Sequence, residues 1–145
     1  MDSGNLDRES AIRKARRIGL IFLVYAIVLP FIVFLLPENE PPISTEPLLL
    51  SWIMIFLMPV ELLLIYAFSR FIQRNPTPNN FLGFAVLMFA LAIAPSIYAS
   101  IIGFIDPLLR SVAVPLGLFF SLTGFWCTLM YLSSYLDIIP SSYSF

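Results

Sequence analysis

Four long apolar stretches, separated by short polar segments, constrain the fold of this chain more than any other feature. A helix needs about 20 apolar residues to cross a hydrocarbon layer about 30 Å thick. Each stretch reaches that length, over residues 18–37, 48–69, 81–105 and 111–136, and the only charge in these ranges is one glutamate in the second. We therefore expect an all-α membrane protein, a four-transmembrane-helix bundle of two hairpins, with helices at about 17–37, 48–72, 81–105 and 111–136.

The composition favours a membrane protein over a soluble one. Hydrophobic residues make up 59% of the chain and charged residues 12%, whereas soluble domains carry about 25% charged residues. The four helices and their short connections account for most of the 145 residues. We therefore expect a single integral membrane domain over 1–145, in which 1–16 is a basic cytoplasmic segment.

The basic residues are distributed unevenly between the two ends of the expected helices. Seven of the eight lie before or at the start of the first helix or near the end of the second, and only Arg110 lies at the other end. Because positive charge is retained in the cytoplasm, we expect a multipass protein of a cell membrane with both termini in the cytoplasm. The basic cluster before the first helix is either this topology signal alone or also a lipid-headgroup site. Its residues are Arg13, Lys14, Arg16 and Arg17.

Small residues recur at short spacing in the third and fourth helices. Membrane helices approach closely where side chains are small, so these two helices should pack as a tight hairpin. A groove for a lipid or cofactor is the alternative interpretation. The expected contact residues are Ala92, Ser96, Ser100, Gly103, Ala113, Gly117, Ser121 and Gly124. The first two helices have few small residues, so their outer faces should contact lipid or another protein.

Glu61 is the acidic residue inside the second apolar stretch. An ionised carboxylate at the centre of a membrane helix costs roughly 2.5–3.5 kcal/mol on insertion scales, and burial favours its neutral form. Because Ser96 and Thr123 are expected at similar depth, these three residues are a candidate proton or ion site. The alternative is that protonated Glu61 only bonds a neighbouring helix. Kinks are predicted where prolines interrupt the helices, at Pro30, Pro59 and Pro95.

The segment at 91–104, LAIAPSIYASIIGF, combines a run of small residues with Ile-Tyr, a further small residue and an apolar stretch that ends in Phe. It resembles the ion-carrying helix of the proteolipid (rotor-ring) subunits of rotary ATPases. That resemblance implies two duplicated hairpins, although Ile93 occupies the position of the family's acid. A four-helix chain with one buried glutamate is also similar in design to small multidrug transporters, whose acid lies in the first helix.

The residues that enzymes use most are scarce in this sequence. There is no histidine, and Ser and Thr occur without a recognisable base. We therefore expect no catalytic residues, no metal site, no cofactor and no nucleic-acid partner. The leading hypothesis is a non-enzymatic accessory subunit or helix-packing scaffold that contacts the lipid bilayer and other membrane proteins or a second copy. The alternative is a proton-coupled small transporter or ion-conducting protein that uses Glu61.

Overall fold

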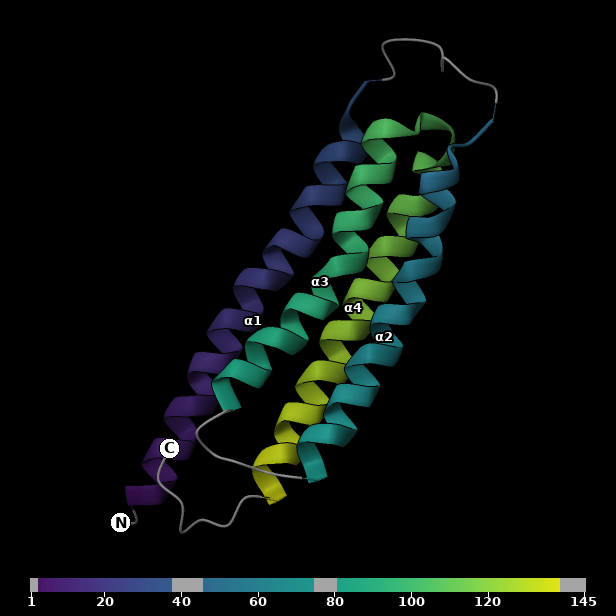
Figure 1. The fold of residues 1–145 in the computed structure, drawn as a ribbon. Helices are drawn as coiled ribbons and strands as arrows, with labels where there is room; N and C mark the ends of the chain where they lie inside the picture. Colours follow the sequence, from purple (N-terminus) through teal and green to yellow (C-terminus); the bar gives the residue numbers. More distant parts are fainter. Residues whose placement is uncertain (1–2, 38–45, 75–80, 139–145) are drawn as a thin grey trace.

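The computed structural model describes residues 3–37, 46–74 and 81–138, and this part of the chain is helical without strands. It forms four helices: α1 (Ser3–Leu35), α2 (Leu49–Arg74), α3 (Phe81–Ile105) and α4 (Pro107–Ile138). Each contains a segment long and apolar enough to cross a membrane. The predicted all-α chain of four long apolar helices is confirmed (Figure 1).

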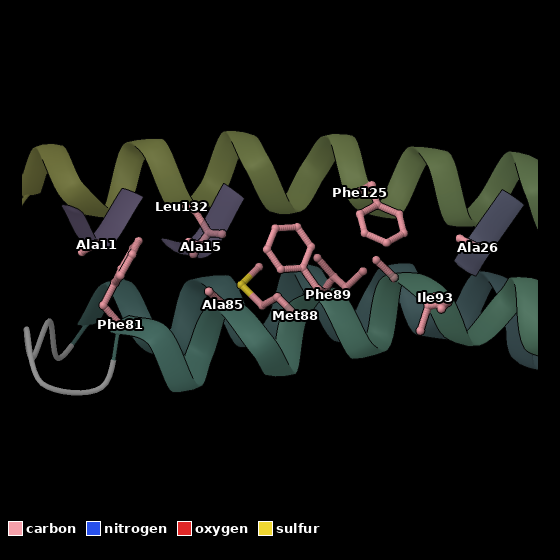
Figure 2. Packing of buried hydrophobic residues seen from close by; sticks show 12 residues of the cluster. Ala11, Ala15, Ala26, Phe81, Ala85, Met88, Phe89, Ile93, Phe125 and Leu132 are labelled. Carbon is pink, nitrogen blue, oxygen red and sulfur yellow. The ribbon is translucent and has the colours of Figure 1, made fainter. Parts of the chain in front are cut away.

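Two helices begin earlier than expected. α1 starts at Ser3 instead of near 17, so most of the basic segment continues the apolar helix. The physical reason is that Ala11 and Ala15 are buried against α3 and α4, in the same cluster as Phe81 and Leu132 (Figure 2). Because helices in proteins are stabilised mainly by packing of one face, these contacts keep the basic segment helical.

α4 starts at Pro107 instead of near 111. Proline is favoured at the first helical position, because its missing N–H has no partner there in any case. Asp106 precedes it in the position of an N-cap, a site that aspartate favours. The Leu109 N–H donates to the Asp106 carbonyl at 3.2 Å, which closes the first turn. The polar turn between α3 and α4 is therefore shorter than the sequence indicated.

α3 and α4 form the central antiparallel pair, and the other two helices lie on opposite sides of it (Figure 1). α1 packs against both central helices, and so does α2. Within the described ranges α1 and α2 do not contact each other. The expected first hairpin is therefore not a packed pair. The reason is that the small residues lie in α3 and α4, where backbones can approach, whereas α1 and α2 are bulkier.

Glycines set the distance between α3 and α4. A Cβ atom added at Gly117 would overlap Ala99 and would lie 2.7 Å from the Pro95 carbonyl oxygen. A Cβ atom at Gly124 would lie 3.2 Å from the Cα atom of Ala92. A side chain at Gly117 would therefore meet backbone, which cannot rotate away. The predicted small-residue faces lie in this interface.

The remaining small residues of these faces extend the contact toward the turn. Ala113 is buried in one cluster with Ala99 of α3. Gly103 lies where three helices meet, since a Cβ atom there would be 2.7 Å from Val33 of α1 and 3.4 Å from Val114 of α4. Ser100 is half-buried and its hydroxyl donates to the Ser96 carbonyl of its own helix.

A buried aromatic pair fills the other half of the bundle. The rings of Phe89 in α3 and Phe125 in α4 stack with centroids 5.6 Å apart (Figure 2). Phe89 also fills the space beside Gly19 of α1, where an added Cβ atom would lie 2.5 Å from the ring. The absence of a side chain at Gly19 thus lets α1 pack on this ring.

Candidate functional site

Glu61 lies on the face of α2 that packs against the central pair. The buried residues of α2 recur every three or four positions, and Met58, Glu61, Ile65 and Ser69 follow one another along one stripe. Residues at this spacing share a helix face. Glu61 is only 8% exposed, so its carboxyl group points into the bundle together with its apolar neighbours on the stripe.

Tyr98 of α3 is the hydrogen-bond partner of this carboxyl group. Its hydroxyl donates to Glu61 Oε1 with an oxygen–oxygen distance of 2.9 Å. The other oxygen, Glu61 Oε2, is buried and makes no hydrogen bond with any described residue. A proton on Oε2 would lack an acceptor, and an ionised Oε2 would lack a donor. Either state leaves one polar group unsatisfied, at a cost of about 1–3 kcal/mol.

Ser96 of α3 forms hydrogen bonds with α1 and α4, and not with Glu61 of α2. Its hydroxyl donates to the carbonyl of Ala26 in α1, and its N–H donates to the Ser121 hydroxyl of α4 at 3.0 Å. Ala26 lies four residues before Pro30, which has no N–H to offer that carbonyl. Ser96 thus supplies the donor that Pro30 removes, and joins α1, α3 and α4 near the middle of the bundle.

The third residue of the predicted trio, Thr123, bonds its own helix. Its hydroxyl donates to the Phe119 carbonyl at 2.8 Å. Glu61, Ser96 and Thr123 are therefore not joined by hydrogen bonds, and the pair Glu61–Tyr98 replaces the trio as the candidate site. The sequence could have indicated Tyr98, because a tyrosine inside an apolar helix needs a hydrogen-bond partner for its hydroxyl.

All three prolines expected to kink the helices lie inside them, and α4 contains a further one, Pro115. Pro30 and Pro95 are buried, whereas Pro59 is exposed on α2. The buried prolines are thus those of α1 and α3, two of the three helices that Ser96 joins.

A second polar cluster lies at the turn between α3 and α4, which we call the turn end. Asp106 and Arg110 are both buried there. Asp106 Oδ2 accepts from the Leu48 N–H at 2.8 Å, at the start of α2. The Arg110 guanidinium donates to the carbonyls of Gly103 and Leu36, at 2.8 and 2.9 Å.

These bonds complement the helix dipoles. A carboxylate is stabilising at a helix N-terminus and a guanidinium at a C-terminus. Asp106 and Arg110 thus hold the ends of α1, α2 and α3 to the beginning of α4. The sequence pattern indicated only their side of the bundle, because contacts between different helix ends leave no local spacing to detect.

The basic cluster lies at the opposite end, which we call the basic end. Arg13, Lys14, Arg16 and Arg17 are exposed on α1. Within residues 3–37, 46–74 and 81–138, no three His, Cys, Asp or Glu side chains are grouped so that they could hold a metal ion.

No family model matches the sequence, and no curated protein or solved structure matches it significantly. The resemblance of 91–104 to proteolipid subunits stays a prediction. The candidate site is defined by its geometry alone.

Proposed function

We propose that this chain is a multipass integral membrane protein of a cell membrane, with both termini in the cytoplasm. The support is the exposed apolar surface on the outer sides of α1 and α2. Phe31 of α1 is largely exposed, and Phe56 of α2 is 71% exposed. A protein in water rarely tolerates apolar patches of this extent. Hydrocarbon solvates them without cost.

The orientation follows from the two ends of the bundle. The basic end carries the exposed cluster of α1 and also Arg70, near the end of α2. At the turn end, Arg110 is engaged with the carbonyls of two helices. Retention of positive charge in the cytoplasm then assigns the basic end to the inside.

Thiol labelling tests this orientation. In a Cys127→Ser background, Ser111→Cys introduces a thiol at the turn end and Ser10→Cys introduces one at the basic end; both positions are exposed. A membrane-impermeant maleimide should label Ser111→Cys in intact cells and Ser10→Cys only after permeabilisation. The reverse pattern would overturn the orientation, and labelling of both in intact cells would overturn the membrane span between them.

We also propose that the protein acts without catalysis, as an accessory subunit or helix-packing scaffold. One observation carries this proposal: α3 and α4 use their small-residue faces on each other, while α1 and α2 leave whole apolar faces uncovered on opposite sides. Two separated faces suit a subunit that contacts neighbours on two sides within the membrane. The partners are other membrane proteins or a second copy.

The mass and composition of the species extracted in mild detergent test this role. Proteins that co-purify at fixed stoichiometry, or a discrete homo-oligomer, support it, and a monomer without partners contradicts it. Phe56→Ala and Leu63→Ala should release a partner bound on α2 without unfolding the chain, because both side chains are largely exposed. Phe119→Ala, at a similarly exposed position on α4, is the matched control.

A second candidate function is proton-coupled transport, or ion conduction, through Glu61. The observation that favours it is the buried oxygen Glu61 Oε2, which has no partner among the described residues. Acidic groups inside membrane segments often carry protons or ions. In liposomes, Glu61→Gln should abolish proton-linked flux while the helical spectrum stays unchanged. Equal flux in the variant, or none in the parent protein, would end this candidate.

A further inference from the structure

A groove of about 400 Å³ lies at the basic end, between α1, α3 and α4. Its volume is in the range of small-molecule sites, about 300–1,000 Å³. The inner wall is formed by buried apolar side chains from all three helices (Figure 2). They are Ala15 of α1, Phe81 and Phe89 of α3, and Leu132 of α4.

The rim of the groove is apolar as well. Trp126 of α4 is 69% exposed, and Leu129 and Met130 beside it are also exposed. In a chain that spans a membrane, such a rim faces hydrocarbon. A molecule that enters the groove from the side must therefore be apolar along the part that enters.

Two polar residues, Arg16 and Ser133, interrupt this apolar lining. Arg16 is the charged residue among the described residues that line the groove. Arg17 follows it directly and Lys14 lies two residues before it, and both are exposed. Arg16 thus lies where the groove meets the polar end of α1. A planar guanidinium binds phosphate oxygens through two parallel hydrogen bonds, so this end of the groove complements a phosphate group.

We propose that this groove binds one anionic glycerophospholipid, with an acyl chain along Phe81, Phe89 and Leu129 and its phosphate on Arg16. The inference rests on the membrane location proposed above. With the basic end in the cytoplasm, the groove opens into the leaflet that carries anionic lipids. An apolar slot with a cation at its polar end matches both halves of such a lipid.

Native mass spectrometry of the purified protein, titrated with defined lipids, tests the proposal. Phosphatidylglycerol and phosphatidylcholine with identical acyl chains are the two probes. The protein should retain one phosphatidylglycerol per chain, at least tenfold more tightly than phosphatidylcholine. Arg16→Gln should remove that preference. Arg17→Gln, which loses the same charge one residue away and does not line the groove, should keep it.

A variant that fills the groove separates specific binding from surface attraction. Ser133 is exposed and lines the groove, and its hydroxyl donates to the Met130 carbonyl of its own helix. Ser133→Phe should therefore weaken retention of both lipids with no change in charge. Equal losses in Arg16→Gln and Arg17→Gln, or equal retention of the two lipids by the parent protein, would overturn the proposal.

Extraction of membranes with alkaline carbonate distinguishes a wrong lipid site from a wrong membrane location. A chain that resists carbonate but retains no phosphatidylglycerol overturns the lipid site and leaves the membrane location standing. A chain that carbonate releases overturns the membrane location, and the lipid site with it. Oligomers without bound lipid in the mass spectrum would mean that a second copy covers the groove, and would overturn the lipid proposal as well.

Discussion

Replacement of Gly117 by alanine should weaken the contact between α3 and α4 directly. The added Cβ atom would overlap Ala99 and would lie 2.7 Å from the Pro95 carbonyl oxygen. An ordinary contact begins near 3.4 Å, so the contact with the Pro95 oxygen alone requires the helices to separate locally by about 0.7 Å, and the overlap with Ala99 requires more. A gap of that size forfeits roughly a quarter to a half of the attraction of each affected atom pair.

The separation also affects a hydrogen bond one turn away. The Ser96 N–H and the Ser121 hydroxyl are 3.0 Å apart, and a shift of this size would break that bond, at about 1 kcal/mol. Overpacking of a tight interface typically costs about 1–3 kcal/mol. The gain in helix propensity from glycine to alanine offsets at most about 1 kcal/mol. We expect a net loss of about 2 kcal/mol in the free energy of unfolding for Gly117→Ala.

The chain offers a matched control in Gly83 of α3. A Cβ atom there would have no neighbour within 4 Å, so Gly83→Ala should raise the free energy of unfolding by about 0.5–1 kcal/mol through helix propensity alone. Both variants are unfolded by increasing SDS fraction in mixed micelles, with helix content followed by circular dichroism. Equal effects of the two substitutions would refute the steric explanation.

Three further predictions use the same unfolding assay. Ser96→Ala leaves the buried carbonyl of Ala26 without its donor and should cost about 1–3 kcal/mol; a loss below about 0.5 kcal/mol would mean that another group satisfies it. Asp106→Ala removes the acceptor at the start of α2 and should cost about 0.5–2 kcal/mol, as N-cap losses do; an unchanged midpoint contradicts this. A double-mutant cycle of Tyr98→Phe with Glu61→Ala should give a coupling of about 0.6 kcal/mol, the average for hydrogen bonds between membrane helices, and at most about 1.7 kcal/mol. Strict additivity would show that the pair contributes nothing.

The features that depend on local composition were predictable from the sequence. The four helices follow from the length of the apolar stretches, and the close contact at Gly117 and Gly124 follows from the spacing of small residues. In both cases the responsible residues lie within a few turns of one helix. Their effect does not depend on how that helix is rotated against its neighbours.

The features that depend on the relative rotation of helices were not predictable. Whether Glu61 meets Ser96, Thr123 or Tyr98 is decided by which faces of α2, α3 and α4 converge, and no spacing within one helix encodes that. The same holds for Arg110, whose two acceptors belong to other helix ends. The start of α1 was not predicted for a different reason. The basic residues of the segment made it look polar, although Ala11 and Ala15 between them form an apolar face.

The arrangement of α1 and α2 on opposite sides of the central pair has a consequence for biosynthesis. Neither helix has a docking surface until the second half of the chain has been made, because within the described ranges both contact only α3 and α4. At the usual rate of about 5–20 residues per second, the 64 residues between the end of α2 and the end of α4 take on the order of 3–13 s. Until residue 96 has been made, the Ala26 carbonyl has no serine hydroxyl to bond. In the membrane location proposed above, the first two helices therefore remain separate segments during synthesis, exposed to any chaperone or insertion factor that recognises unpaired helices.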